Sequence, residues 1–401
     1  MDKIRFLGAE NEISRVPFGS ILKETREKTT MENEDTLLSC AINGIFRNDE
    51  LFSHFRGSST IGYIKVKKND LILSAQNLHL GNANVNLRFE HGIISPAYKV
   101  YRITGAEPEY IAQWVKRPAA NQFFLAATTE GASQCRKNID WDALYRQPIV
   151  LPSSDEQKKI AKLLMSLDSQ IAFEKTEVRK LKDFKSAMLT KMFPKEGKTE
   201  PEIRFPGFTD AWEQRKLGEI AKEVVRNDPA SDAPIMMITA GNGFIEQSDR
   251  YAFNNAGESL KKYILLERGE LAYNHGASKL RPYGSCFALT TVEKARIPFV
   301  YHCFSVEKSN PEFLSIELNG ANVENQLRKI VSSGARMDGL LNIAYSEYTE
   351  VTVQLPKKEE QDWIAKFFKH LDTLITLHQR KHEKLIDTKK AFLEKLIGGE
   401  E

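Results

Sequence analysis

The stretch LPSSDEQKKIAKLLMSLDSQI (Leu151–Ile171) occurs a second time as LPKKEEQDWIAKFFKHLDTLI (Leu355–Ile375). The offset is 355 − 151 = 204, and the match continues without a gap to Phe193 and Ile397. Similarity at a fixed distance indicates duplication of a structural unit. The chain is therefore predicted to contain two copies of one architecture.

Weaker matches extend the repeat upstream and keep the same order along the chain. They pair Ile4-Arg5-Phe6 with Ile203-Arg204-Phe205, Gly19 and Ile21 with Gly218 and Ile220, Tyr63-Ile64 with Tyr263-Ile264, Pro108-Glu109 with Pro311-Glu312, and Asn138-Ile139 with Asn342-Ile343. Residues 28–130 and 227–330 otherwise share little. The two copies are therefore expected to share a scaffold and to differ in what they recognise.

The repeated stretch is predicted to be a long helix in each copy, over residues 155–193 and 359–397, because it lacks internal glycine and proline. Its apolar residues have the 3-4 spacing of a heptad seam. The seam residues are Ile160, Leu164, Leu167, Ile171 and Leu181 in the first copy, and Ile364, Phe368, Leu371, Ile375 and Leu385 in the second. We expect the two helices to form an antiparallel coiled coil with a pseudo-two-fold repeat; a parallel pair is the alternative.

The remaining part of each copy is predicted to be a globular α+β domain, which makes α+β the fold class. The segments STIGYIKV, DLILSA, PAYKVYRI, KYILLE, GELAYN and FVYHCFSV are strand-like, and PEYIAQWV and PEFLSIEL are typical of short helices that begin with proline. The expected organisation is domain 1 over 1–150, the first helix over 151–194, a linker over 195–211, domain 2 over 212–354 and the second helix over 355–397.

These motifs resemble the specificity subunits of type I restriction–modification enzymes. The resemblance rests on LPxxxEQxxIAxxLxxLDxxI in both copies and on the junction PEIRFPGFTDAWEQRKLGEI (Pro201–Ile220), and it covers essentially the whole chain. It implies that each globular part is a target-recognition domain that reads one half of a bipartite, interrupted double-stranded DNA sequence. One departure is that the first copy lacks a counterpart of Trp212.

The same resemblance implies the partners and the absence of catalysis. The helices would form the coiled coil that spaces the readers and would dock two methyltransferase (modification) subunits, while ATP-dependent restriction and translocation subunits cut the DNA. The chain itself would be a non-catalytic subunit in restriction and DNA methylation, with no cofactor of its own.

Candidate DNA contacts lie in four loops rich in Asn, Gln, Arg and Lys, which are the side chains that read base edges and phosphates. They are Gln76, Asn77, Asn82, Asn84 and Arg88; Gln134, Arg136 and Lys137; Asn274, Ser278, Lys279, Arg281 and Tyr283; and Ser333 and Arg336. Such clusters also occur as ordinary turns. A coiled-coil scaffold protein without direct DNA readout therefore remains the alternative function.

An autonomous DNA enzyme is the other rival, and its motifs are missing from the sequence. Asn227-Asp228-Pro229-Ala230 does not fit the loop with which adenine methyltransferases hold a flipped base, and no phosphate-binding GxxxxGK[ST] loop occurs. His378 and His382 lie one helical turn apart, but both fall on the seam, where polar residues set register. No metal site is expected.

Composition agrees with a DNA-binding protein whose basic groups are placed locally. The net charge is only +3, so a polycation that coats nucleic acid is excluded. The four cysteines are isolated, which indicates reduced structural thiols. The first residues have no apolar core of a secretion signal, and no apolar run reaches the length of a membrane helix. We expect a cytoplasmic protein without membrane contact.

Overall fold

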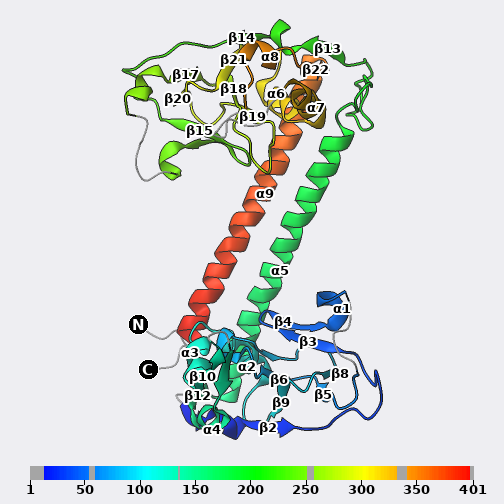
Figure 1. Ribbon diagram of the computed structural model, residues 1–401, viewed down its shortest axis with the longest axis vertical. Helices are drawn as coiled ribbons and strands as arrows, with labels where there is room; N and C mark the ends of the chain where they lie inside the picture. The colour runs from blue at the N-terminus through cyan, green and yellow to red at the C-terminus, as the bar shows by residue number, and fades with distance from the viewer. Residues whose placement is uncertain (1–12, 54–58, 134–135, 251–256, 332–340, 398–401) are drawn as a thin grey trace. The chain divides into compact units, whose positions relative to one another are not determined.

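The computed structural model describes residues 13–53, 59–133, 136–250, 257–331 and 341–397 (Figure 1). At residues 130–133, 136–137 and 257–258 it describes the backbone alone. The chain forms two compact units: unit 1 comprises residues 1–177 with 378–401, and unit 2 comprises residues 178–377. Each unit mixes helices and strands and takes in part of both long helices. Within the described ranges, none of the helices has an apolar stretch of membrane-spanning length.

A four-stranded antiparallel sheet lies at the centre of unit 1. Its spatial order is β2 (Leu22–Thr25), β9 (Tyr98–Ile103), β6 (Asp70–Ser74) and β7 (Ala83–Val85). The two-stranded antiparallel pairs are β1 (Ile13–Pro17) with β12 (Pro148–Pro152), β3 (Leu38–Ala41) with β4 (Gly44–Arg47), β5 (Ile64–Lys67) with β8 (His91–Ile94), and β10 (Thr128–Ser133) with β11 (Arg136–Ile139). The short helices are η1 (Phe18–Ile21), α1 (Asn48–Leu51), η2 (Leu78–Leu80), α2 (Pro108–Trp114), α3 (Ala120–Leu125) and α4 (Trp141–Arg146).

Unit 2 follows the same plan in its central sheet and in its strand pairs β13–β22, β15–β16 and β17–β20. Its four-stranded sheet has the order β14 (Ala221–Glu223), β21 (His302–Val306), β18 (Leu271–Asn274) and β19 (Ser285–Ala288). The pairs are β13 (Glu213–Lys216) with β22 (Thr352–Leu355), β15 (Met236–Thr239) with β16 (Gly243–Glu246), and β17 (Ile264–Glu267) with β20 (Lys294–Ile297). The short helices are η3 (Leu217–Glu219), η4 (Gln247–Asp249), η5 (Gly257–Lys262), α6 (Pro311–Leu318), α7 (Ala321–Ile330) and α8 (Tyr345–Tyr348).

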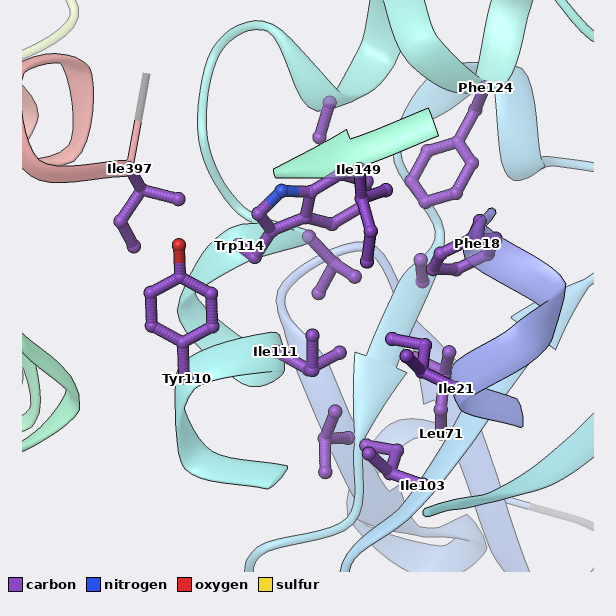
Figure 2. Close-up of a cluster of buried hydrophobic side chains, with 14 of the residues drawn as sticks. Phe18, Ile21, Leu71, Ile103, Tyr110, Ile111, Trp114, Phe124, Ile149 and Ile397 are labelled. Atoms are coloured by element: carbon purple, nitrogen blue, oxygen red, sulfur yellow. The ribbon is translucent and has the colours of Figure 1, made fainter. Parts of the chain in front are cut away.

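The central sheet of unit 1 is buried on both faces, because alternate residues of β6 join different cores. Leu71 packs into a cluster with α2 and the start of the first long helix, and Figure 2 shows it with Ile111 and Trp114 of α2. Ile72, the next residue along, packs with Leu38 against the β3–β4 and β5–β8 pairs. Side chains alternate across a strand, so a strand buried on both faces carries consecutive apolar residues, here Leu71–Leu73.

Unit 2 divides its sheet between two cores in the same way. Leu271 and Tyr273 of β18 join α6, α7 and the second long helix. Ala272 packs on the opposite face with the β15–β16 and β17–β20 pairs. The weak sequence similarity of residues 28–130 and 227–330 therefore conceals one common scaffold. The strands and short helices expected from the sequence are confirmed.

The two long helices are α5 (Ser154–Lys191) and α9 (Lys358–Phe392), with a π-helical turn over Leu393–Ile397 after α9. Every residue of the expected apolar seam is buried or half-buried. Ile160, Leu164 and Leu167 belong to the main core of unit 1, and Ile364, Phe368 and Leu371 to that of unit 2. The seam therefore anchors each helix in a globular core, in addition to any packing of helix on helix.

A buried glutamine fixes each long helix to its globular part. Gln157 donates from Nε2 to the Pro152 carbonyl at 2.8 Å and accepts from the Glu107 backbone N–H at 2.9 Å. Gln361 bonds the Pro356 carbonyl and the Asn310 backbone N–H, both at 2.8 Å. Glu107 and Asn310 are the N-caps of α2 and α6. Each glutamine bridge thus ties a strand end, a short helix and a long helix together.

We predict that Gln157→Ala destabilises unit 1 by about 2–4 kcal/mol, because it leaves the half-buried amide of Glu107 and the half-buried carbonyl of Pro152 without this partner. Gln170→Ala on the exposed side of the same helix is the control and should change stability by less than about 0.5 kcal/mol. Urea unfolding of the full chain measures both. Equal effects of the two substitutions would contradict the role of the bridge.

Candidate nucleic-acid interface

Two of the candidate loops occupy the same position in the two units. The loop that carries Gln76 and Asn77 joins β6 to β7, and the loop that carries Lys279 joins β18 to β19. Both connections end at the edge strand of the central sheet. Gln76, Asn77 and Lys279 are exposed, so their side chains are available to a ligand.

Asn82 and Asn84 are buried, and their amides are used inside unit 1. Asn82 donates to the Cys40 carbonyl at 3.1 Å, and Asn84 donates to the Ala41 carbonyl at 2.8 Å. These bonds hold the β3–β4 pair against β7. The two side chains therefore serve the fold.

Arg88 is half-exposed but already has a carboxylate partner. Its guanidinium binds both carboxylate oxygens of Glu50, at 2.9 and 2.6 Å. The hydrogen bonds from Arg88 hold the pKa of Glu50 below its ordinary value. Two N–H groups of Arg88 are therefore already bound to Glu50.

The second loop is built around an internal turn. Ser278 Oγ accepts from the Arg281 backbone N–H at 3.0 Å, and Asn274 donates to the Ile238 carbonyl at 3.1 Å. Arg281 points away from solvent, where its Nη1 donates to the Asn319 carbonyl at 2.7 Å, beyond the end of α6. Burial lowers the pKa of Arg281. Tyr283 is half-buried against the main core of unit 2.

The remaining candidates belong to the second pair of loops. Arg136 and Lys137 lie in β11, where the backbone alone is described. Gln134, Ser333 and Arg336 lie outside the described residues.

The structure adds a residue to each exposed loop that the sequence reasoning missed. Leu80 is 51 % exposed in the first loop and Leu280 is 64 % exposed in the second. An apolar tip can contact a thymine methyl group or wedge between bases. The offset 280 − 80 = 200 is close to the 200–203 of the neighbouring matches, and this correspondence could have identified the pair.

His378 and His382 of the second long helix bind protein groups. His378 Nδ1 lies 2.6 Å from Glu174 Oε2, and His382 Nδ1 lies 3.1 Å from the Ile171 carbonyl oxygen. Glu174 also accepts from Lys381, and these bonds hold the pKa of its carboxylate below the ordinary value. In the part of the chain that the structure describes, no cluster of His, Cys, Asp and Glu has an arrangement for a metal ion.

The cysteines that the structure describes are buried free thiols: Cys40, Cys286 and Cys303. Burial raises the pKa of Cys40 to about 11 and that of Cys286 to about 12. A thiol that stays protonated is a poor nucleophile and metal ligand. Cys135 lies outside the described residues.

Comparison with known proteins finds relatives among the specificity subunits of type I restriction enzymes. The chain is 24 % identical over 372 residues to the putative type I restriction enzyme MjaX specificity subunit of Methanocaldococcus jannaschii, a match that covers 88 % of this chain and 78 % of that protein. It is 24 % identical over 299 residues to the MjaVIII specificity subunit of the same organism, covering 69 % and 67 %. No family model matches the chain.

The solved structure of the type I restriction–modification S subunit from M. genitalium has the same fold, with a TM-score of 0.59, 12 % identity and full coverage of both chains. The resemblance carried by the repeated motif is thereby confirmed: in sequence along most of its length, and in fold along all of it, this chain is similar to the specificity subunits of type I restriction–modification enzymes.

Proposed function

We propose that this chain is the DNA-reading, non-catalytic specificity subunit of a type I restriction–modification complex. The observation that carries the proposal is the pair of equivalent loops, β6–β7 and β18–β19, which extend from one common scaffold and differ in sequence. A duplicated scaffold with different loops suits the reading of two different half-sites. The target-recognition domains are residues 1–150 and 212–354, and residues 195–211 link the two copies.

The helices, residues 151–194 and 355–397, form the antiparallel coiled coil that spaces the two readers. Contacts inside each unit support this arrangement. In unit 1, Lys389 binds Asp168; in unit 2, Lys185 binds Asp372. These two ion pairs are images of each other, since 389 − 185 = 204 and 372 − 168 = 204. In a two-fold arrangement, each contact recurs with the partners exchanged.

The pseudo-two-fold axis passes through the contact of Glu174 with His378. The offset 378 − 174 = 204 makes these two residues images of each other, and only a residue on the axis touches its own image. Glu174 is 1 % exposed in its side chain. The axis therefore runs beside a buried carboxylate.

The outer sides of the helices dock the methyltransferase subunits. Large apolar side chains are exposed there, including Phe173 at 57 % and Trp363 at 58 %. Exposed apolar surface of this kind is typical of protein–protein contact. DNA and ATP-dependent restriction subunits complete the assembly.

We predict that Lys279→Ala weakens binding of the assembled complex to its target DNA and reduces the slope of log affinity against log salt by about 1, as expected for the loss of one phosphate contact. It should leave stability unchanged, because Lys279 is exposed. Arg281→Ala should instead cost about 1.5–3 kcal/mol of stability, because the guanidinium bonds the Asn319 carbonyl. DNA binding that is insensitive to salt would favour the scaffold interpretation.

Because the two target-recognition domains share a scaffold, the recognition segment of domain 1 can be replaced by that of domain 2. Replacing residues 28–127 by residues 227–330 of the same chain should give a target with two identical half-sites in inverted orientation, because readers related by a two-fold bind a palindrome. Sequencing of the methylated motif decides the outcome. If the half-site read by domain 2 also changes, the readers are not modular.

The length of the helix pair should set the number of unread base pairs. Four residues inserted after Glu177 and four after Leu377 keep every contact within each unit, because both insertions fall at the unit boundary. They lengthen the pair by about 6 Å, nearly two base pairs at ~3.4 Å each. We expect a longer spacer with unchanged half-sites. The control substitutes alanine for the exposed Lys175 and Arg179, which changes the helix surface without changing its length. An unaltered spacer in an active insertion variant would show that the helix pair does not set the spacer length.

A further inference from the structure

The β3–β4 hairpin of unit 1 and the β15–β16 hairpin of unit 2 turn at the same dipeptide. It is Asn43-Gly44 in the first hairpin and Asn242-Gly243 in the second, at the offset 242 − 43 = 199. The two glycines have φ angles of +147° and +68°, which favour glycine over other residues. The dipeptide is therefore kept in segments of the two copies that otherwise share little sequence.

The asparagine side chains of the two tips are exposed and unused. Neither amide of Asn43 or Asn242 has a hydrogen-bond partner among the described residues. The buried Asn82 and Asn84 differ in this respect, because both donate to backbone carbonyls. An Asn-Gly pair favours a hairpin turn for backbone reasons. That preference explains the turn, but it assigns no role to the exposed amide.

In unit 2, the hairpin tip lies beside the β18–β19 loop. A Cβ atom at Gly241 would lie 3.8 Å from Leu280 Cδ2, and Leu280 follows the exposed Lys279 in the loop. Asn274, at the end of β18, donates to the Ile238 carbonyl of β15 at 3.1 Å. The hairpin tip and the loop are therefore neighbours, and together they expose an amide and an ammonium group.

In unit 1, a lysine that follows α2 reaches the hairpin tip. Lys116 Nζ donates to the Ile42 carbonyl at 2.6 Å, and Asn84 of β7 donates to the neighbouring Ala41 carbonyl at 2.8 Å. Lys116 is half-buried and forms no ion pair with any of the described residues. Burial lowers the pKa of Lys116 to about 8, as expected for an ammonium group that has no anionic partner.

A DNA phosphate is the ligand that fits a feature common to both readers. Two readers of different half-sites contact different base pairs, whereas the phosphate backbone is the same in both half-sites. Asparagine and lysine are both among the usual donors to phosphate oxygens. An exposed amide beside a lysine without a carboxylate partner therefore matches the chemistry of a phosphate group.

We propose that each hairpin tip binds a phosphate group of the DNA backbone. Asn43 and Lys116 bind it in the half-site of domain 1, and Asn242 and Lys279 bind its equivalent in the half-site of domain 2. The tips then fix the register of each domain on the DNA, while other residues of the β6–β7 and β18–β19 loops read the bases. This inference rests on the proposed DNA-reading function and adds the two hairpins to it.

Glycine in place of each asparagine tests the amide and keeps the turn, because glycine adopts every backbone conformation of a hairpin tip. In the assembled complex, Asn43→Gly and Asn242→Gly should each weaken binding to the target DNA about threefold to tenfold, the effect of one lost neutral hydrogen bond. The slope of log affinity against log salt should not change, because no charge is removed. The matched control is Asn33→Gly, an exposed asparagine in a turn outside the hairpins. Urea unfolding of each variant checks that the fold is intact.

The lysine and the methylated motif give two independent readouts. Lys116→Met keeps the alkyl chain and removes the charge, so it should weaken binding and lower the salt slope by about 1. Sequencing should find the same methylated motif in every variant, because phosphate contacts carry no sequence information. Affinities equal to that of Asn33→Gly, an unchanged salt slope in Lys116→Met, or an altered motif would overturn the proposal. If the unsubstituted complex itself bound DNA without specificity or salt dependence, the proposed function would fail instead.

Discussion

The glutamine bridge at the start of each long helix is the constraint on which the rest of the structure depends. A long helix that is held to its globular part only by apolar residues along one face could rotate or slide, because apolar contacts are not directional. Gln157 and Gln361 remove that freedom, because each binds the carbonyl of a proline at or just after the end of a strand and the backbone N–H of the residue that caps a short helix. The direction of each helix is thereby fixed to the short helix, α2 or α6, that packs on the sheet that carries the loops. This explains why the repeated motif contains a polar residue at a buried position.

Duplication within one chain allows a contact on the proposed axis that a true dimer could not make. In a symmetric homodimer a residue on the axis meets an identical residue, and two carboxylates or two imidazoliums would repel. Here a glutamate, Glu174, meets a histidine, His378, and Lys381 adds a cation. The two copies have therefore diverged where symmetry had its highest electrostatic cost, while the ion pairs beside the axis still follow the repeat.

The sequence predicts the scaffold well because its signals are local. Helix length, the apolar seam and the short strands follow from spacing within a few turns or residues. The candidate DNA contacts were harder to predict, because a polar side chain in a loop can find a partner that is distant in the chain. Asn84 bonds Ala41, and Arg281 bonds Asn319. A sequence pattern shows which side chains can form hydrogen bonds, and only the fold shows which of them remain free.

The position of the exposed loops also explains how recognition can change without loss of the fold. Each loop leads to an edge strand, β7 or β19, which has a neighbouring strand on one side only, so a change in loop length does not interrupt the pairing of the other strands. The loop has eight residues in unit 1, 75–82, and ten in unit 2, 275–284, and the strand after it still pairs in both units. The free energy of closing a loop grows only slowly with its length. A change in loop length therefore has a small effect on the free energy of folding at the place where the two units expose Gln76, Asn77 and Lys279.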